Sequence, residues 1–177
     1  MRKMIVPALA ALMLASGAAV AQKAENPDKA EAVYKVATPD FAKTVMSSNE
    51  FEIQSSKLAE EKAAATDVKE FAKQMIADHT KAGEGLKAAL EKSNMTPEAP
   101  KLSPKHAAMV EQLKAASGED FQMLYIDMQT QAHMEAVTLF RTYSGSGDDQ
   151  NVVAFAKKTL PTLEMHLMHV KELVAAH

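Results

Sequence analysis

Six histidines are the residues best able to do strong chemistry in this chain of 177 residues. The sequence contains no Cys, which excludes disulfide frameworks, thiolate zinc sites, iron–sulfur clusters and covalently attached c-type haem. A bound metal ion would therefore need ligands from His, carboxylate or Met side chains. The position of each His on its helix thus decides which chemistry is open to the protein.

Three of the His and one Glu are predicted to face the core of a helical bundle. At about 100° per residue, His79 falls at the centre of the apolar stripe of its helix, and His166 falls within the stripe of another. His133 lies inside the edge of a broad apolar arc, and Glu52 lies on the inward stripe of the first helix. Each of the four long helices thus contributes one ionisable residue to the core.

Buried ionisable groups must satisfy one another or bind something, because unpaired burial is costly. We predict a site for one transition-metal ion, either iron, copper, manganese or zinc, with Glu52, Asp78, His79, His133 and His166 as candidate ligands. Asp78 lies about 100° around the helix from its neighbour His79, at the boundary of the bundle. There it can either support a metal-binding side chain or be a solvated acid. Two other hypotheses stay open: a purely structural polar layer, and a metal-dependent oxidoreductase that uses the same cluster.

The heights of these residues along their helices agree only in part. If the chain reverses near residues 64 and 65, Glu52 and His79 lie within about two residues of the same level, or roughly 3 Å, and can meet. His133 and His166 are offset by about seven residues, or roughly 10 Å, if both helices are straight. A kink at the proline of the last helix, or an irregular start to that helix, would reduce this offset.

The chain is predicted to be helical, because the β-branched alternation typical of strands is missing from the sequence. Capping residues, Pro and Gly positions and apolar periodicity predict helices over about 39–63, 67–92, 104–116, 119–143 and 149–176. Residues 94–103 are predicted to form a connection, and residues 144–147 a loop. Four long helices, with one short helix between the second and third, predict an all-α four-helix bundle.

The N-terminus is predicted to be an export signal. Residues 1–21 combine two basic residues, an apolar stretch and the small residues Ala19-Val20-Ala21 at a cleavage site before Gln22. We therefore predict a signal peptide (1–21), a flexible charged leader (22–37) and a bundle domain (38–177). The mature protein is expected in the periplasm or secreted, without a membrane-spanning segment.

The net charge and the motifs of the chain exclude further classes of function. The chain has 20 Lys plus Arg against 23 Asp plus Glu, a net charge of -3, so binding to nucleic acid is not expected. The sequence contains neither a Gly-rich phosphate loop nor the strand–turn–helix elbow of a serine nucleophile. These observations favour a binding or structural module over an enzyme.

Methionines gather on the outer faces of the last two long helices, at positions 123, 134, 165 and 168. The simpler explanation for these outward methionines is a homodimer formed through these helix faces. The alternative is a surface copper site made by the last two of these methionines with His169. His106 and His177 are predicted to be exposed.

Four segments carry a resemblance to a known family: residues 52–63, residues 68–80 with Ala77-Asp78-His79, residues 131–133, and residues 155–166 with Leu160-Pro161-Thr162-Leu163. They resemble a family of exported bacterial proteins known as DUF4142, a domain of unknown function, over Phe41 to Lys171. The resemblance implies a ferritin-like four-helix bundle and the same five candidate site residues, but no activity.

Ferritin-like di-iron sites use Glu-x-x-His pairs. None of the six His has Glu three residues before it, which argues against that kind of site.

Overall fold

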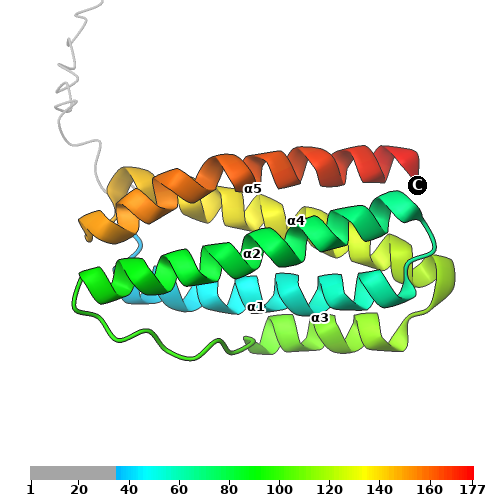
Figure 1. Cartoon of the computed structure of the whole chain (residues 1–177), viewed down its shortest axis with the longest axis horizontal. Helices are drawn as coiled ribbons and strands as arrows, with labels where there is room; N and C mark the ends of the chain where they lie inside the picture. Colours follow the sequence, from blue (N-terminus) through cyan, green and yellow to red (C-terminus); the bar gives the residue numbers. More distant parts are fainter. Residues whose placement is uncertain (1–34) are drawn as a thin grey trace, which may run out of the picture. The chain divides into compact units, whose positions relative to one another are not determined.

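The computed structural model describes residues 35–177, which form five α-helices (Figure 1). They are α1 (Thr38–Lys62), α2 (Thr66–Lys92), α3 (Pro104–Ala115), α4 (Gly118–Ser146) and α5 (Gln150–Ala176). The predicted all-α fold, with a short helix between the second and third long ones, is confirmed. The predicted signal peptide and residues 22–34 of the predicted leader lie outside the described residues. None of the helices in residues 35–177 is both long and apolar enough to cross a bilayer.

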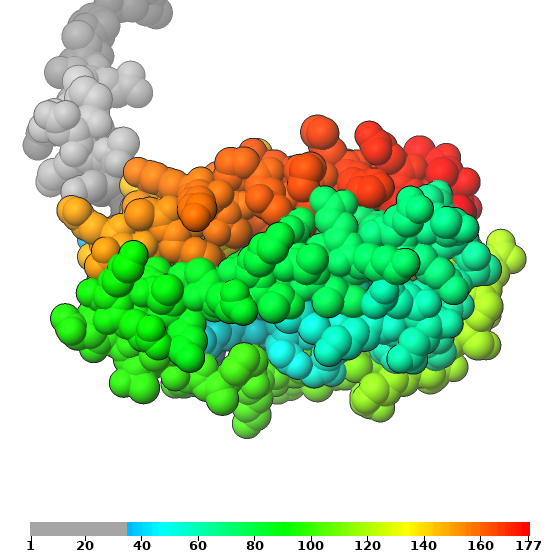
Figure 2. Space-filling view, in the orientation of Figure 1, coloured from blue at the N-terminus to red at the C-terminus, as the bar shows by residue number. Residues whose placement is uncertain are grey.

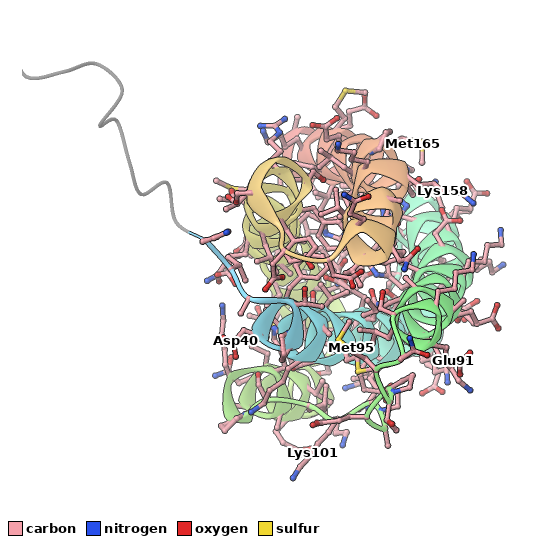
Figure 3. The ribbon with its side chains drawn as sticks, turned by 90° about the vertical axis from the view of Figure 1, so that its left-hand side faces the viewer. Asp40, Glu91, Met95, Lys101, Lys158 and Met165 are labelled. Atoms are coloured by element: carbon pink, nitrogen blue, oxygen red, sulfur yellow. The ribbon has the colours of Figure 1, made fainter. Side chains whose placement is uncertain are left out.

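The four long helices form two antiparallel hairpins, α1 with α2 and α4 with α5 (Figure 1). The hairpins pack together because α2 lies against α5 and α1 lies against α4. A long connection that contains α3 crosses from the end of α2 to the start of α4, as in ferritin-like bundles. Figure 3 shows α3 and the connection, marked by Lys101, on the outside of α1.

The apolar core is divided into two clusters by a polar layer. One cluster surrounds Phe51, Phe71 and Tyr125, and the other surrounds Phe41 and Phe140. The residues between them are polar on every long helix, as buried Glu52, His79, His133 and His166 show. A break in the core at one level on all four helices indicates that these polar side chains interact.

The helix α4 is one turn longer than the sequence predicts. It continues through Ser144 and Gly145 to Ser146, so the predicted loop over residues 144–147 is wrong for its first three residues and correct for Gly147. Ser146 Oγ donates to the carbonyl of Thr142 at 2.9 Å, and the Gly147 N–H donates to the carbonyl of Tyr143 at 2.8 Å. The backbone bond of Gly147 continues the i→i−4 pattern, so Ser144, Gly145 and Ser146 are helical in spite of their low helix propensity.

The helix α3 buries one face against α1, and His106 belongs to that face together with Met109, Val110 and Leu113. His106 Nδ1 lies 2.6 Å from Ser47 Oγ. Its ring also stacks on Phe51 at a centroid distance of 5.2 Å. The prediction that His106 is exposed is therefore wrong.

Candidate metal centre

Three histidines from three helices meet at the level of the polar layer. His79 on α2, His133 on α4 and His166 on α5 have ring centroids 5.4 to 5.6 Å apart. Each ring has one nitrogen that lies within 4.8 Å of one nitrogen in each of the other two rings. All three side chains are buried, with exposed fractions of 3%, 0% and 1% respectively. We call these three residues the His triad.

Each ring of the triad donates one hydrogen bond to a neighbouring acceptor. His79 Nδ1 lies 2.8 Å from Asn49 Oδ1 on α1. His133 Nδ1 lies 2.9 Å from the carbonyl oxygen of Gln129, one turn earlier on α4. His166 Nε2 lies 3.1 Å from Asp78 Oδ2 on α2. Because these oxygens accept, the bonded nitrogen carries the proton in each ring.

The second nitrogen of each ring has no hydrogen-bond partner among residues 35–177. These atoms are Nε2 of His79, Nε2 of His133 and Nδ1 of His166. In a neutral imidazole with one N–H, the other nitrogen carries a lone pair, which is the form that binds metal ions. The core therefore contains three unpaired nitrogen donors that come from three different helices.

The surroundings keep the triad neutral. Burial lowers the pKa of His79 well below its ordinary value, and the nearby His133 and His166 lower it further. Burial also lowers the pKa of His133 to about 4, although its bond to the Gln129 carbonyl opposes the shift. Burial lowers the pKa of His166 as well, and the hydrogen bond to Asp78 works against this. At neutral pH no proton competes with a metal ion for these nitrogens.

Glu52 lies beside the triad but does not meet His79. Its side chain is 1% exposed, and its Oε1 is 3.9 Å from His133 Nδ1. The expected contact with His79 is made instead by Asn49, three residues earlier on α1. Burial raises the pKa of Glu52 to about 8, an effect that Gln129 partly offsets. The carboxyl is therefore protonated at neutral pH.

Asp78 lies at the boundary of the bundle. Its side chain is 25% exposed, and it accepts the hydrogen bond from His166 while Lys81 lies 3.8 Å away on its other side. Of the two roles expected for Asp78, the structure shows the contact with a candidate ligand. Asp78 thus contacts the protonated nitrogen of His166, and one oxygen of the Glu52 carboxyl lies near the protonated nitrogen of His133.

The predicted offset between His133 and His166 is largely removed by the longer α4. His133 lies 13 residues before Ser146, and His166 lies 16 residues after Gln150. The remaining difference of three residues corresponds to about 4.5 Å along straight helices. Their ring centroids are 5.4 Å apart, so both side chains reach the same site.

The triad is reached from the surface through a groove between α2 and α5, on the face turned to the reader in Figure 2. The groove has a volume of about 280 Å³, and Asp78, His79 and His166 line it together with Lys81 and Lys158. A small solute can therefore approach two of the three His from solvent.

Sequence reasoning missed Asn49, whose side-chain oxygen orients His79, and Gln129, whose backbone carbonyl orients His133. Both are buried, and both lie on inward stripes three or four residues from Glu52 and His133 respectively. A buried amide three residues from a candidate ligand is the signal that could have found Asn49. The carbonyl that His133 uses would be supplied by any residue at position 129.

The outer methionines and His169 lie in surroundings unlike those of the triad. Met165 and Met168 are 44% and 64% exposed, and Figure 3 shows Met165 on the outer side of α5. The ring of His169 packs edge-on against Phe71 at a centroid distance of 5.0 Å. His169 thus contributes to helix packing.

The sequence of residues 19–173 matches the family described as Domain of unknown function (DUF4142). The chain belongs to this family. No curated protein matches it.

Three solved structures share the fold of this DUF4142 protein. CopM in the Cu(II)-bound form is 14% identical with a TM-score of 0.67, and the match covers 79% of this chain and 97% of CopM. A DUF305 fragment from Deinococcus radiodurans is 16% identical with a TM-score of 0.66, over 77% and 94% of the two chains. A DUF305 protein of Streptomyces coelicolor is 12% identical with a TM-score of 0.64, over 77% and 90%. At these identities the similarity concerns the fold alone.

Proposed function

We propose that this protein is an exported helical bundle that binds one transition-metal ion through His79, His133 and His166. The observation that carries the proposal is the set of three buried, unpartnered ring nitrogens. Three unsatisfied acceptors in one core are costly, and a metal ion would satisfy all three. The hydrogen bonds to Asn49, Gln129 and Asp78 resemble those that orient metal-bound His in other proteins.

The chemistry of the donors favours copper or zinc. Imidazole nitrogens suit both ions, and divalent copper has the highest affinity of the first-row series for a given site. CopM, which has a similar fold, is known in a Cu(II)-bound form. We therefore propose copper(II) first and zinc second, with iron and manganese less favoured because the three closely spaced donors are all imidazole nitrogens.

The two carboxylates of the predicted set are proposed to act next to the ligands. Asp78 orients His166 through their hydrogen bond. Glu52 is the buried carboxyl beside His133, and its ionisation would supply one negative charge to balance that of a bound cation.

Export is proposed from the N-terminal sequence, with cleavage before Gln22. Expression of the full chain in a bacterial host, followed by fractionation and mass measurement, tests this. Recovery of a periplasmic chain that begins at Gln22 supports export, whereas a full-length chain bound to membrane contradicts it.

Metal titration tests the proposed site. The purified protein should bind one copper(II) or zinc ion per chain, as measured by elemental analysis and by competition with a chromophoric chelator. Replacement of His79, His133 or His166 by Gln should weaken binding at least about 100-fold, because each removes a ligand. His177→Gln and His169→Gln serve as matched controls and should bind like the wild type.

If the wild type binds no ion and the triad variants bind like the controls, the polar layer is purely structural. If metal binds, oxygen consumption and peroxide turnover by the loaded protein separate a carrier from an oxidoreductase.

A further inference from the structure

The three free nitrogens of the His triad are sealed from solvent. Each has an accessible surface below 1 Å². The groove between α2 and α5 is bordered by the rings of His79 and His166, but solvent in it does not touch their free nitrogens. A metal ion can therefore bind only after part of this wall moves.

His79 borders three hollows of the molecule, and they differ in what else they reach. One, lined mainly by α1 and α4, has a volume of about 180 Å³. Another, of about 480 Å³, lies beside α1, α2 and residues 97–100. The third is the α2–α5 groove, of about 280 Å³. Of these three, the α2–α5 groove alone is also lined by His166 and by Asp78, the acid bonded to that ring.

His166 is held less firmly than the other two rings. His79 is bonded to the buried side chain of Asn49, and His133 to a buried carbonyl of its own helix. The bond of His166 is made to Asp78, whose side chain is 25% exposed. Breaking a bond to a buried partner leaves that partner unsatisfied, whereas water can replace an exposed one. His166 is thus the triad ring that can leave its place at the lowest cost.

The helix under His166 also has a weak point. Pro161 lies in the interior of α5, five residues before His166. It has no N–H, so the carbonyl of Lys157 lacks its helical partner. Such an interruption of the hydrogen-bond ladder makes a helix easier to bend. The helices of the other two rings, α2 and α4, contain no Pro.

We propose that the α2–α5 groove is the entry path of the metal ion and that His166 is the ligand that moves to admit it. This inference rests on the proposed metal site. Asp78 holds the ring in its inward position. When their bond breaks, the ring turns toward the groove, where its Nδ1 and the Asp78 carboxylate together make the first contact with the ion. Return of the ring then brings the ion to His79 and His133.

The rim of the groove controls how fast an ion arrives. Lys81 and Lys158 both line it, and Figure 3 shows Lys158 at the edge of α5 next to α2. Their positive charges oppose the approach of a divalent cation, and salt screens this effect. Removal of one of these charges should therefore accelerate entry at low salt.

Stopped-flow kinetics on the purified protein tests the path. Association of copper(II) is followed by its absorbance, and dissociation by transfer of the ion to an excess of a chromophoric chelator. The association rate should level off at high copper concentration, because opening of the His166 ring then limits it. A site that is permanently open would give a rate that rises linearly with concentration.

Three matched variants each place a Trp over one of the three hollows. Thr162→Trp lies over the α2–α5 groove, Glu84→Trp over the hollow beside residues 97–100, and Thr44→Trp over the hollow between α1 and α4. Thr162→Trp should slow both association and dissociation at least about tenfold and leave the dissociation constant unchanged, because a path affects both directions equally. The other two variants should keep the wild-type rates.

Two smaller substitutions test the moving ligand and the rim without adding bulk. Asp78→Ala should raise the limiting association rate at least about threefold, although it weakens equilibrium binding, because the inward ring loses its hydrogen bond to the protein. Lys158→Gln should accelerate association about threefold at low salt and have no effect at high salt.

The proposal is overturned if Thr162→Trp keeps the wild-type rates, if Glu84→Trp or Thr44→Trp slows entry instead, if the rate stays linear in copper concentration, or if the limiting rate does not rise in Asp78→Ala. Equilibrium titration of the same samples separates this result from failure of the site. A wild type that binds no copper overturns both proposals, whereas normal binding with unchanged rates in Thr162→Trp overturns the entry path alone.

Discussion

Asp78 on α2 accepts a hydrogen bond of 3.1 Å from His166 on α5, and this contact decides which nitrogen of His166 is free. The bond holds the proton on Nε2, so the lone pair is on the unpartnered Nδ1. In His79 and His133 the situation is reversed, because Nδ1 is bonded and Nε2 is free. The triad thus contains two tautomers: Nδ1 carries the proton in His79 and His133, and Nε2 carries it in His166.

Replacement of Asp78 by Ala should weaken metal binding by about 10- to 100-fold, because His166 then loses the acceptor that fixes its tautomer. Asp78→Asn should recover part of this loss, since its amide oxygen can still accept from Nε2. Competitive titration with copper(II) and zinc measures both effects. Asp67→Ala is the matched control, because Asp67 also accepts from a His, at 3.1 Å from His177 Nε2, but away from the triad. Equal losses in both Ala variants would contradict the role of Asp78.

The stability of the metal-free protein should be highest near pH 6.5. The pKa of each triad His is lowered from 6.5, so the unfolded chain binds more protons below that pH and stability falls as the solution is acidified. The pKa of Glu52 is raised from 4.5 to about 8, so the folded protein binds more protons in this interval and stability falls as pH rises towards 8. Burial lowers the pKa of His106 as well, so four histidines act below pH 6.5 against Glu52, and of these five groups only Glu52 acts above it.

Glu52→Gln should therefore remove the decline between pH 6.5 and 8, which reaches at most about 1.4 kcal/mol per pH unit for one proton. Urea unfolding at several pH values measures the slope for the wild type and the variant. Glu135→Gln is the control, because Glu135 is exposed and its pKa is lowered by the Lys105 contact despite some desolvation. A variant that keeps the wild-type slope above pH 6.5 would show that Glu52 is ionised in the folded protein.

The helices and the inward position of the triad could be predicted because both depend on local periodicity. The apolar stripe on each long helix has a period that places His79 and His166 inside the bundle, and burial bears this out. The sequence could not separate Asn49 from Glu52 as the partner of His79. Three residues on a helix differ by only about 60° and 4.5 Å, which is less than the reach of either side chain.

Other features depend on contacts that are distant in sequence. Helix propensity alone would end α4 before Ser144, so the predicted offset between His133 and His166 was too large. His106 begins an apolar stripe that continues at Met109, Val110 and Leu113, which argues against the predicted surface position. That stripe indicates a buried face, but the sequence does not say that α1 covers it.

Lys62 should fix the end of α3 to the bundle. Its Nζ donates to the carbonyls of Leu113, Lys114 and Ala116 at 3.0, 2.7 and 2.7 Å, where the last carbonyls of a helix lack partners. Lys62→Met keeps the apolar stem and should lower the free energy of unfolding by about 1 to 2 kcal/mol. Hydrogen exchange should accelerate in α3 more than in α2. Lys57→Met, at an exposed position of α1, should change neither quantity.

The metal-free protein should stay folded, and metal should add stability without adding helix. The triad is already oriented by protein acceptors, so binding requires little ordering of the chain. With free copper(II) or zinc at 100 times its dissociation constant, the free energy of unfolding should rise by about 2.7 kcal/mol, which corresponds to roughly 5 to 10 °C in the unfolding temperature. A chelator should reverse the rise while the circular dichroism of the helices is unchanged. Loss of helix on chelation would instead mean that the ion is needed to build the bundle, and an equal rise in His79→Gln would place the stabilising ion outside the triad.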